Sequence, residues 1–209
     1  MNKTLLRTLT VLLVALAVVL LGTVAVAETD AYQVNYYANA HTMCAPDATV
    51  YIDNPGAANY GPLCALIYVF TADQQMVECC GCNESPNDLN TLSVDNDLTS
   101  NPLTSTIPTA GVIKIVSAPL NGSVCDPTSS ITPPTPDLRA WATHIQSQCI
   151  YSDDSGYAIT ETPFLDAKLS SPELDALQSQ CAFIGILGSG HGICTCGTGA
   201  TSPNKKKKK

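Results

Sequence analysis

Two short cysteine clusters are the residues in this chain best suited to chemistry: 79–82 (Cys-Cys-Gly-Cys) and 194–196 (Cys-Thr-Cys). Close sulfurs can bind zinc, and His191 is nearby, but paired zinc ligands usually have two or more residues between them. Neither cluster has that spacing, and neither contains the Cys-x-x-Cys of a thiol redox centre. Disulfide bonding is the favoured use of these sulfurs, and it requires an oxidising compartment.

The first 27 residues have the pattern of a secretion signal. Lys3 and Arg7 supply the positive start, 9–21 is apolar apart from one threonine, and 25–27 is a small-x-small cleavage site. The sequence therefore predicts a secreted or extracellular protein, with the periplasm or the cell surface as variants. The alternative is an uncleaved anchor over 9–27, which is nearly long enough to span a bilayer. After removal of the signal, no integral membrane span is expected.

All ten cysteines follow this signal. An even number of cysteines in an exported chain predicts a set of about five disulfides. The sequence does not decide which cysteine pairs with which. The expected disulfide cysteines are Cys44, Cys64, Cys79, Cys80, Cys82, Cys125, Cys149, Cys181, Cys194 and Cys196.

The remaining candidates for catalysis or metal binding have simpler explanations. The loop 188–192 presents Ser189 and His191, but a serine hydrolase also needs an orienting acid, and no G-x-S-x-G elbow is present. A glycine-rich exit from a helix explains this loop. No catalytic residue, cofactor-binding residue or metal ligand is predicted.

Two oxygen-rich turns, 95–97 and 153–156, could contribute to a Ca²⁺ site. Neither follows the twelve-residue EF-hand pattern. Aspartate, asparagine, serine and glycine are also the ordinary residues of turns, which accounts for both segments without an ion.

The charge of the chain is unevenly distributed. Between the signal and the tail, Lys114, Arg139 and Lys168 stand against all eighteen carboxylates, so 28–204 carries a net charge near −15. A body of that charge is not expected to bind nucleic acid. It does favour solubility outside the cell.

The chain ends in five lysines, Lys205–Lys209. The simplest interpretation is that 201–209 is a disordered, solvated basic tail, or a cloning remnant. The functional interpretation is an electrostatic tether to an anionic surface, such as a polysaccharide, a membrane leaflet or the acidic body of another copy.

The elements that must position these residues are mainly strands. An uninterrupted apolar run at 64–71 predicts a strand buried on both faces, and a turn at 72–74 joins it to 75–80 in a hairpin. Adjacent Cys79 and Cys80 would then point to opposite faces and bond to different partners, one across the core and one at the surface. The other predicted strands are 33–37, 48–53, 89–94 and 112–117, with a polar, turn-rich stretch at 95–102.

The segment 138–150 fits two structures. An apolar stripe at helical spacing would make it a helix, whereas alternation around Trp141 would make it a strand that pairs with 157–162. The β-rich surroundings favour the hairpin.

One clear helix is expected over 171–187. Ser171 is the expected N-cap and Pro172 the first helical residue. An apolar stripe that includes Cys181 faces the core, so a disulfide there would pin the helix to the sheet. The stripe consists of Leu174, Leu177, Cys181 and Ile184.

Together these elements predict a mainly β, disulfide-stapled β-sandwich-like domain over 28–200 with one C-terminal α-helix. Its loop 118–137 is a candidate internal boundary. The chain resembles small, cysteine-rich, uncharacterised secreted proteins of soil bacteria of the acidobacterial type, which implies a bacterial source and no assigned activity. The resemblance lies in 64–70 (CALIYVF), 79–82 (CCGC), 98–103 (LTSNPL), 111–116 (GVIKIV) and 180–184 (QCAFI) through Cys194.

The favoured function is a secreted, non-catalytic structural or binding module at the cell surface or in the matrix. One alternative is an extracellular hydrolase of polysaccharide or peptide, which would need two carboxylates in a cleft beside an aromatic platform. Another is a subunit of a surface assembly, which would need long unpaired strand edges.

Overall fold

The computed structural model describes residues 31–42, 45–56, 61–120, 122, 124–129, 133–146 and 158–197. Within them, nine strands and one α-helix, α2, follow the predicted order closely. The strands are β1 (Tyr32–Tyr37), β2 (Thr49–Asn54), β3 (Leu63–Thr71), β4 (Met76–Glu84), β5 (Asp88–Ser93), β6 (Gly111–Pro119), β7 (Arg139–Ile145), β8 (Ile159–Pro163) and β9 (Leu165–Asp166), and α2 is Ser171–Leu187.

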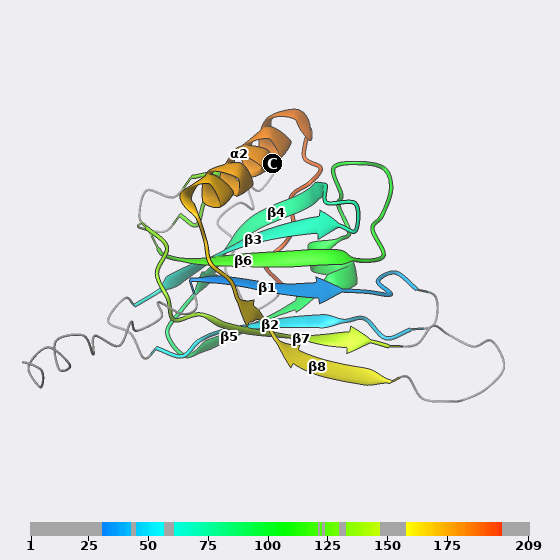
Figure 1. The fold of residues 1–209 in the computed structure, drawn as a ribbon, viewed down its shortest axis with the longest axis horizontal. Helices are drawn as coiled ribbons and strands as arrows, with labels where there is room; N and C mark the ends of the chain where they lie inside the picture. The colour runs from blue at the N-terminus through cyan, green and yellow to red at the C-terminus, as the bar shows by residue number, and fades with distance from the viewer. Residues whose placement is uncertain are drawn as a thin grey trace, which may run out of the picture.

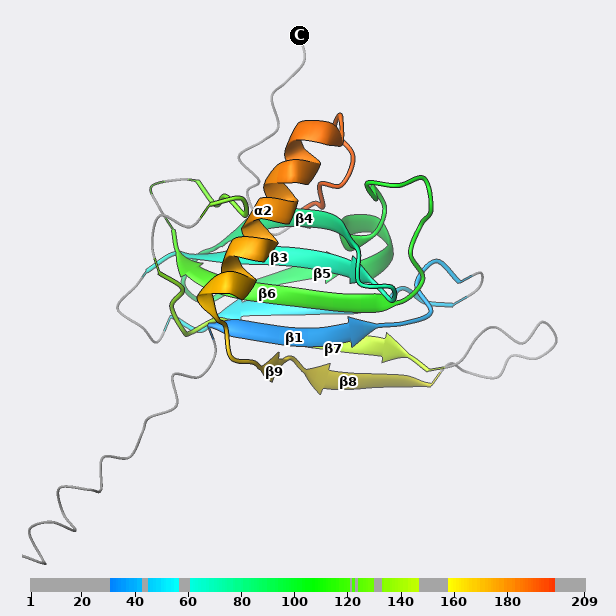
Figure 2. The same cartoon turned by 45° about the horizontal axis from the view of Figure 1, so that its top comes forward.

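The strands form two antiparallel sheets. The first sheet has the order β4-β3-β6-β1-β9, and the second has the order β5-β2-β7-β8. Helix α2 lies across the first sheet, on the side away from the second (Figure 1 and Figure 2). The mainly β sandwich with one C-terminal helix is thus confirmed.

Strand β3 is the centre of the packing, as its apolar run predicts. Alternate residues from Leu63 to Val69 join the core between the two sheets, and those from Cys64 to Phe70 join a second core beneath α2. Every residue from Leu63 to Phe70 is buried. A strand covered on both faces needs apolar residues at consecutive positions, which explains the unbroken run.

The ambiguous segment after residue 138 is a strand. Thr143 of β7 pairs with Glu161 of β8, and Ile145 pairs with Ile159. The hairpin prediction is confirmed over 139–145 and 159–163, while its connection at 147–157 lies outside the described residues.

Helix α2 begins one residue before the predicted position. Ser170, not Ser171, is the N-cap: its backbone is extended, and its hydroxyl accepts a hydrogen bond of 3.3 Å from the backbone N–H of Glu173. The side chain of an N-cap residue accepts a hydrogen bond from the backbone N–H two or three residues later. Glu173 lies three residues after Ser170, so the first of the two adjacent serines is the cap. The expected apolar stripe is confirmed, with Leu177, Cys181 and Ile184 buried. None of the described helices is long and apolar enough to cross a membrane.

A second local difference lies in the stretch 95–102, predicted as turns. Its start is a single turn of π-helix, η1 (Val94–Leu98), whose N-cap Ser93 accepts a hydrogen bond from the backbone of Asn96. Apolar residues at both ends, Val94 and Leu98, are buried in the core and hold this wide turn in place.

Strand β4 carries three of the four disulfides among the described residues. Cys79 bonds to Cys181 of α2, whereas Cys80 and Cys82 bond to the C-terminal segment, and the fourth disulfide ties β3 to the loop after β6. The opposite orientation of Cys79 and Cys80 is confirmed, but the surface location expected for one of them is wrong, because α2 covers Cys79. Cys44 and Cys149 lie outside the described residues. The bonded pairs are Cys64–Cys125, Cys79–Cys181, Cys80–Cys194 and Cys82–Cys196.

The C-terminal segment also covers the open edge of β4. The backbone N–H of Cys79 donates to the carbonyl of Gly192 at 2.9 Å, and that of Cys194 donates to the carbonyl of Cys79 at 3.3 Å. Ile193 thereby forms a parallel bridge with Cys79. The edge strand of the first sheet is therefore paired within the chain.

The disulfides should contribute unequally to stability. Cys79 and Cys181 are 102 residues apart, but the neighbouring Cys80–Cys194 bridge reduces the effective loop to about 15 residues. The double substitution Cys79→Ala/Cys181→Ala should therefore cost about 3 kcal/mol of unfolding free energy. Cys64→Ala/Cys125→Ala opens a loop of 61 residues that the other described bridges do not shorten, and it should cost about 4 kcal/mol.

Guanidinium unfolding of both variants beside the parent protein measures this order. A larger loss from the Cys79–Cys181 pair would show that packing beneath α2, rather than loop closure, dominates the contribution of that bridge.

Candidate functional site

Two aromatic side chains stack on the outer face of the second sheet. Tyr51 of β2 pairs with Trp141 of β7, and their ring centroids are 5.6 Å apart with planes inclined by 23°. Their neighbours Val50, Ile52 and Ala142 point into the core, so both rings point away from it. Figure 1 shows α2 on the first sheet, on the side away from the second.

A cavity of about 440 Å³ borders Trp141. Trp141 has Tyr51 of β2 as one cross-strand neighbour and Pro163 of β8 as the other. The cavity is lined from β1, β7, β8 and β9 but not from β2, so it lies on the side of the indole away from Tyr51. Its lining residues are Gln33, Arg139, Ala140, Trp141, Glu161, Thr162, Pro163, Phe164 and Asp166.

The polar groups of this Trp141 cavity combine hydrogen-bond donors and acceptors. Arg139 supplies a guanidinium, Glu161 and Asp166 supply carboxylates, and Thr162 supplies a hydroxyl. Arg139 comes from the start of β7, whereas Glu161 and Asp166 lie on β8 and β9, where the chain passes from the second sheet to the first. One apolar wall with convergent polar groups is typical of a small-molecule site.

The buried side chain of His144 contacts the hydroxyl of Thr162, one of the residues that line the cavity. His144 Nε2 lies 2.7 Å from Thr162 Oγ1, to which Asn35 Nδ2 also donates at 3.2 Å. The ring of Tyr36 stacks on His144 at 4.1 Å, and burial lowers the pKa of His144, which favours its neutral form.

This pair is not a complete catalytic unit. A nucleophile–base pair needs a third group to orient the base, and His144 Nδ1 has no hydrogen-bond partner among the described residues. Positioning of the Thr162 hydroxyl is therefore the role that the contacts of His144 support.

Two fully buried glutamates, Glu78 and Glu84, are hydrogen-bonded to neighbouring segments of the chain. Burial raises the pKa of each to about 8. Glu78 accepts from the backbone N–H of Asn101 at 2.7 Å, and Glu84 accepts from Asn90 Nδ2 at 3.0 Å. The second carboxyl oxygen of each glutamate is buried and has no hydrogen-bond partner among the described residues. Neither glutamate lines the Trp141 cavity.

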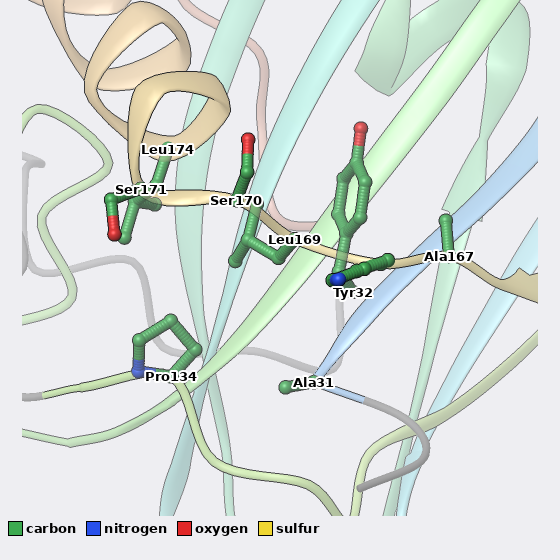
Figure 3. Close-up of a pocket in the computed structure, with 9 residues that line it drawn as sticks. Ala31, Tyr32, Pro134, Ala167, Leu169, Ser170, Ser171 and Leu174 are labelled. Atoms are coloured by element: carbon green, nitrogen blue, oxygen red, sulfur yellow. The ribbon is translucent and has the colours of Figure 1, made fainter. Parts of the chain in front are cut away.

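A second cavity, of about 410 Å³, opens at the start of α2 between β1 and the loop before β7 (Figure 3). Two of its lining residues, Tyr32 and Ser170, bond to Glu173, which does not line the cavity. Ser170 caps the helix, and Glu173 accepts from both Tyr32 Oη at 3.1 Å and Lys114 Nζ at 2.6 Å. The Lys114 hydrogen bond lowers the pKa of Glu173. These contacts attach the start of α2 to β1 and β6.

The metal-binding candidates from the sequence are engaged elsewhere. The sulfurs of Cys80, Cys82 and Cys196 lie within 4.8 Å of one another, but all three belong to disulfides and are not thiolates. Asp95 accepts from the backbone N–H of His41 at 2.9 Å, and Asp97 accepts from Thr195 Oγ1 at 2.6 Å. These carboxylates hold neighbouring segments together.

The other candidates are either exposed or outside the described residues. His191 is exposed on a shallow hollow lined by 100–105 and Ile107, away from the Trp141 cavity. The turn 153–156 and the lysine tail Lys205–Lys209 lie outside the described residues.

Trp141 is predicted from the sequence to lie on a strand face, but no local pattern identifies Trp141, Arg139, Glu161 and Asp166 as one site. They are brought together by the register of β7 with β8 and by the β1–β9 pairing. One feature of the sequence could have indicated this site. The single tryptophan, Trp141, lies two residues from Arg139, which is one of only three lysines and arginines in 28–204.

The fold and this cavity define a disulfide-bonded β-sandwich with a polar, aromatic-walled hollow. No protein-family model matches the chain, and no curated protein matches it. A solved structure titled "Crystal Structure of Thermotoga maritima 1070" is similar, with a TM-score of 0.40 and 12% sequence identity, over 65% of this chain and 93% of that one. A similarity of that extent supports no inference about function.

The buried glutamates should make the protein less stable as the pH rises. Each binds a proton in the folded state up to about pH 8 but loses it near pH 4.5 when unfolded, so stability falls between these values by at most about 1.4 kcal/mol per pH unit and group. Below about pH 6.5, the lowered pKa of His144 acts in the opposite direction, because only the unfolded state binds its proton. The glutamates therefore dominate between pH 6.5 and 8.

Urea unfolding across this window tests the expectation with Glu84→Gln, which keeps the shape of the side chain without its charge. The variant should be more stable than the parent at pH 8, with a shallower pH slope. Equal slopes would show that Glu84 is ionised in the folded protein.

Proposed function

We propose that this protein is an exported, non-catalytic binding module whose Trp141 cavity takes a neutral oligosaccharide. The observation that carries the proposal is the position of Trp141. Tyr51 stacks beside the indole, and a cavity whose lining includes Arg139, Glu161 and Asp166 borders it.

The chemistry of a sugar suits this combination. The C–H groups on one face of a pyranose ring pack on the electron-rich face of an indole. Its hydroxyls both donate and accept, so they can bond to Arg139 and to Glu161 or Asp166 at the same time. An acidic sugar is disfavoured because carboxylates outnumber the guanidinium in the lining and the body of the chain is strongly negative.

A glycoside hydrolase is the second candidate, because Glu161 and Asp166 line the same cavity beside Trp141. Such an enzyme needs one carboxyl that stays protonated near neutral pH. Our proposal is binding without hydrolysis, and release of reducing sugar by the protein distinguishes the two functions.

The described strand edges give less support to an assembly subunit. The edge of β4 is covered by the chain's own 192–194 segment, and β9 has two residues. The outer edge of β8 is five residues long and ends at Pro163, which lacks a backbone N–H. These three edges are poor templates for another chain, whereas the fourth described edge is β5, whose six residues pair with β2 on one side.

Export and attachment at the cell surface or in the matrix are part of the proposal. The predicted signal at 1–27 and the four disulfides support an oxidising compartment outside the cytoplasm. The resemblance to secreted proteins of soil bacteria is consistent with this location.

Affinity electrophoresis in gels that contain soluble β-glucan or xylan, with pull-down on insoluble cellulose and chitin, tests the proposal. The parent protein should be retarded or retained by at least one of these glycans. Trp141→Ala should weaken that binding at least tenfold, because it removes the apolar wall, and Tyr51→Ala should weaken it less. Phe183→Ala is the matched control, since it removes an exposed aromatic ring from α2.

Two results would contradict the proposal: no glycan retards the parent protein, or Trp141→Ala binds as the parent does. Release of reducing sugar by the parent, abolished in Glu161→Gln or Asp166→Asn, would establish the hydrolase instead. If both variants only weaken binding, the carboxylates serve as hydrogen-bond acceptors.

A further inference from the structure

Two pairs of cysteines meet where the C-terminal segment packs against β4. Cys80 and Cys82 lie two residues apart on β4, so their side chains share one face of the strand. Cys194 and Cys196 belong to the same core cluster between the sheets, and all four are buried. The sulfurs of Cys80, Cys82 and Cys196 lie within 4.8 Å of one another, and Cys194 is bonded to Cys80. We name Cys80, Cys82, Cys194 and Cys196 the four-sulfur cluster.

The spacing of this cluster suits a tetrahedral zinc ion when its sulfurs are thiolates. A Zn–S bond of about 2.3 Å places the four sulfurs of such a site about 3.8 Å from one another. The unbonded sulfurs of Cys80, Cys82 and Cys196 already lie near that separation. A spacing of one residue is short for a zinc-binding loop, but on an extended strand it directs both sulfurs to the same side. Two such pairs on neighbouring segments supply four ligands.

Hydrogen bonds that involve no sulfur hold the same two segments together. Thr195, between the two C-terminal cysteines, donates its backbone N–H to the carbonyl of Asp97 at 2.9 Å and its hydroxyl to Asp97 Oδ1 at 2.6 Å. Asn101 Nδ2 donates to the carbonyl of Ile193 at 3.2 Å, and the backbone N–H of Asn101 donates to Glu78 of β4 at 2.7 Å. The C-terminal cysteines therefore have contacts that keep them beside β4 when the two disulfides are open.

We propose that the four-sulfur cluster binds one Zn²⁺ ion in the chain whose disulfides have not yet formed. Each thiol of the cluster loses its proton and binds the ion through sulfur, so that 4 RSH + Zn²⁺ gives Zn(SR)₄²⁻ + 4 H⁺. Thiolates select Zn²⁺ over Ca²⁺ and Mg²⁺, which prefer oxygen ligands. The bound ion holds the segment 194–196 on β4 before oxidation.

Closure of the disulfides releases the metal. Two molecules of a disulfide oxidant accept four electrons from the four thiolates, so that Zn(SR)₄²⁻ + 2 R′SSR′ + 4 H⁺ gives 2 RSSR + 4 R′SH + Zn²⁺. The two protein disulfides that form are Cys80–Cys194 and Cys82–Cys196, which are the bonds that the structure contains. The inference is independent of the glycan proposal, because no cysteine lines the Trp141 cavity.

Reduction of the full chain with a water-soluble phosphine, without denaturant, followed by titration with Co²⁺ and then Zn²⁺, tests the proposal. Each disulfide that opens consumes one phosphine and one water and gives two thiols and one phosphine oxide. Co²⁺ should bind at one ion per chain with the visible absorption of tetrahedral thiolate coordination, and Zn²⁺ should displace it. The oxidised protein should give no such absorption, because it has no thiolates at this site.

Two double variants assign the ligands. Cys82→Ser/Cys196→Ser removes two of the four and should weaken Co²⁺ binding at least a hundredfold. Cys64→Ser/Cys125→Ser is the matched control, because it removes the cysteines of another disulfide and leaves the cluster intact. It should bind Co²⁺ as the parent does.

Alkylation mapped by mass spectrometry gives a second measurement that needs no variant. In the reduced parent protein, Zn²⁺ should slow alkylation of the four proposed ligands at least tenfold and leave Cys64 and Cys125 unchanged. Absence of the tetrahedral Co²⁺ absorption, or equal Co²⁺ affinity of the two double variants, overturns the proposal. Protection of a different set of cysteines places the ion elsewhere and overturns it as well.

Discussion

The closure of strand β4 is the constraint on which the rest of the structure depends. As the edge of the first sheet, β4 would present unpaired backbone groups to solvent, and such an edge recruits other chains. The segment 192–194 bonds to it instead, and three disulfides from β4 make that arrangement permanent. Because Cys79 and Cys80 point to opposite faces, one strand joins the helix layer on one side and the C-terminal segment on the other.

This arrangement divides the surface into unlike parts. The helix covers the first sheet, so β3 is buried on both faces and can carry no site. The second sheet keeps an outer face on which Tyr51 and Trp141 stand among polar neighbours. The chain then passes from β8 to β9 between the sheets, and the Trp141 cavity lies at that crossing. The proposed binding site follows from where the fold leaves an aromatic side chain uncovered.

The sequence predicted the features that depend on local pattern. The unbroken apolar run of β3, the alternation in β7 and the stripe of α2 each reflect a period that burial imposes. Features that depend on register or on distant pairing were not accessible. Nothing local to Cys79 indicates Cys181, and Trp141 meets Glu161 and Asp166 only through the β7–β8 and β1–β9 pairings. The N-cap error at Ser170 is of a different kind, because it is local: the spacing from Ser170 to Glu173 favours the first of the two adjacent serines.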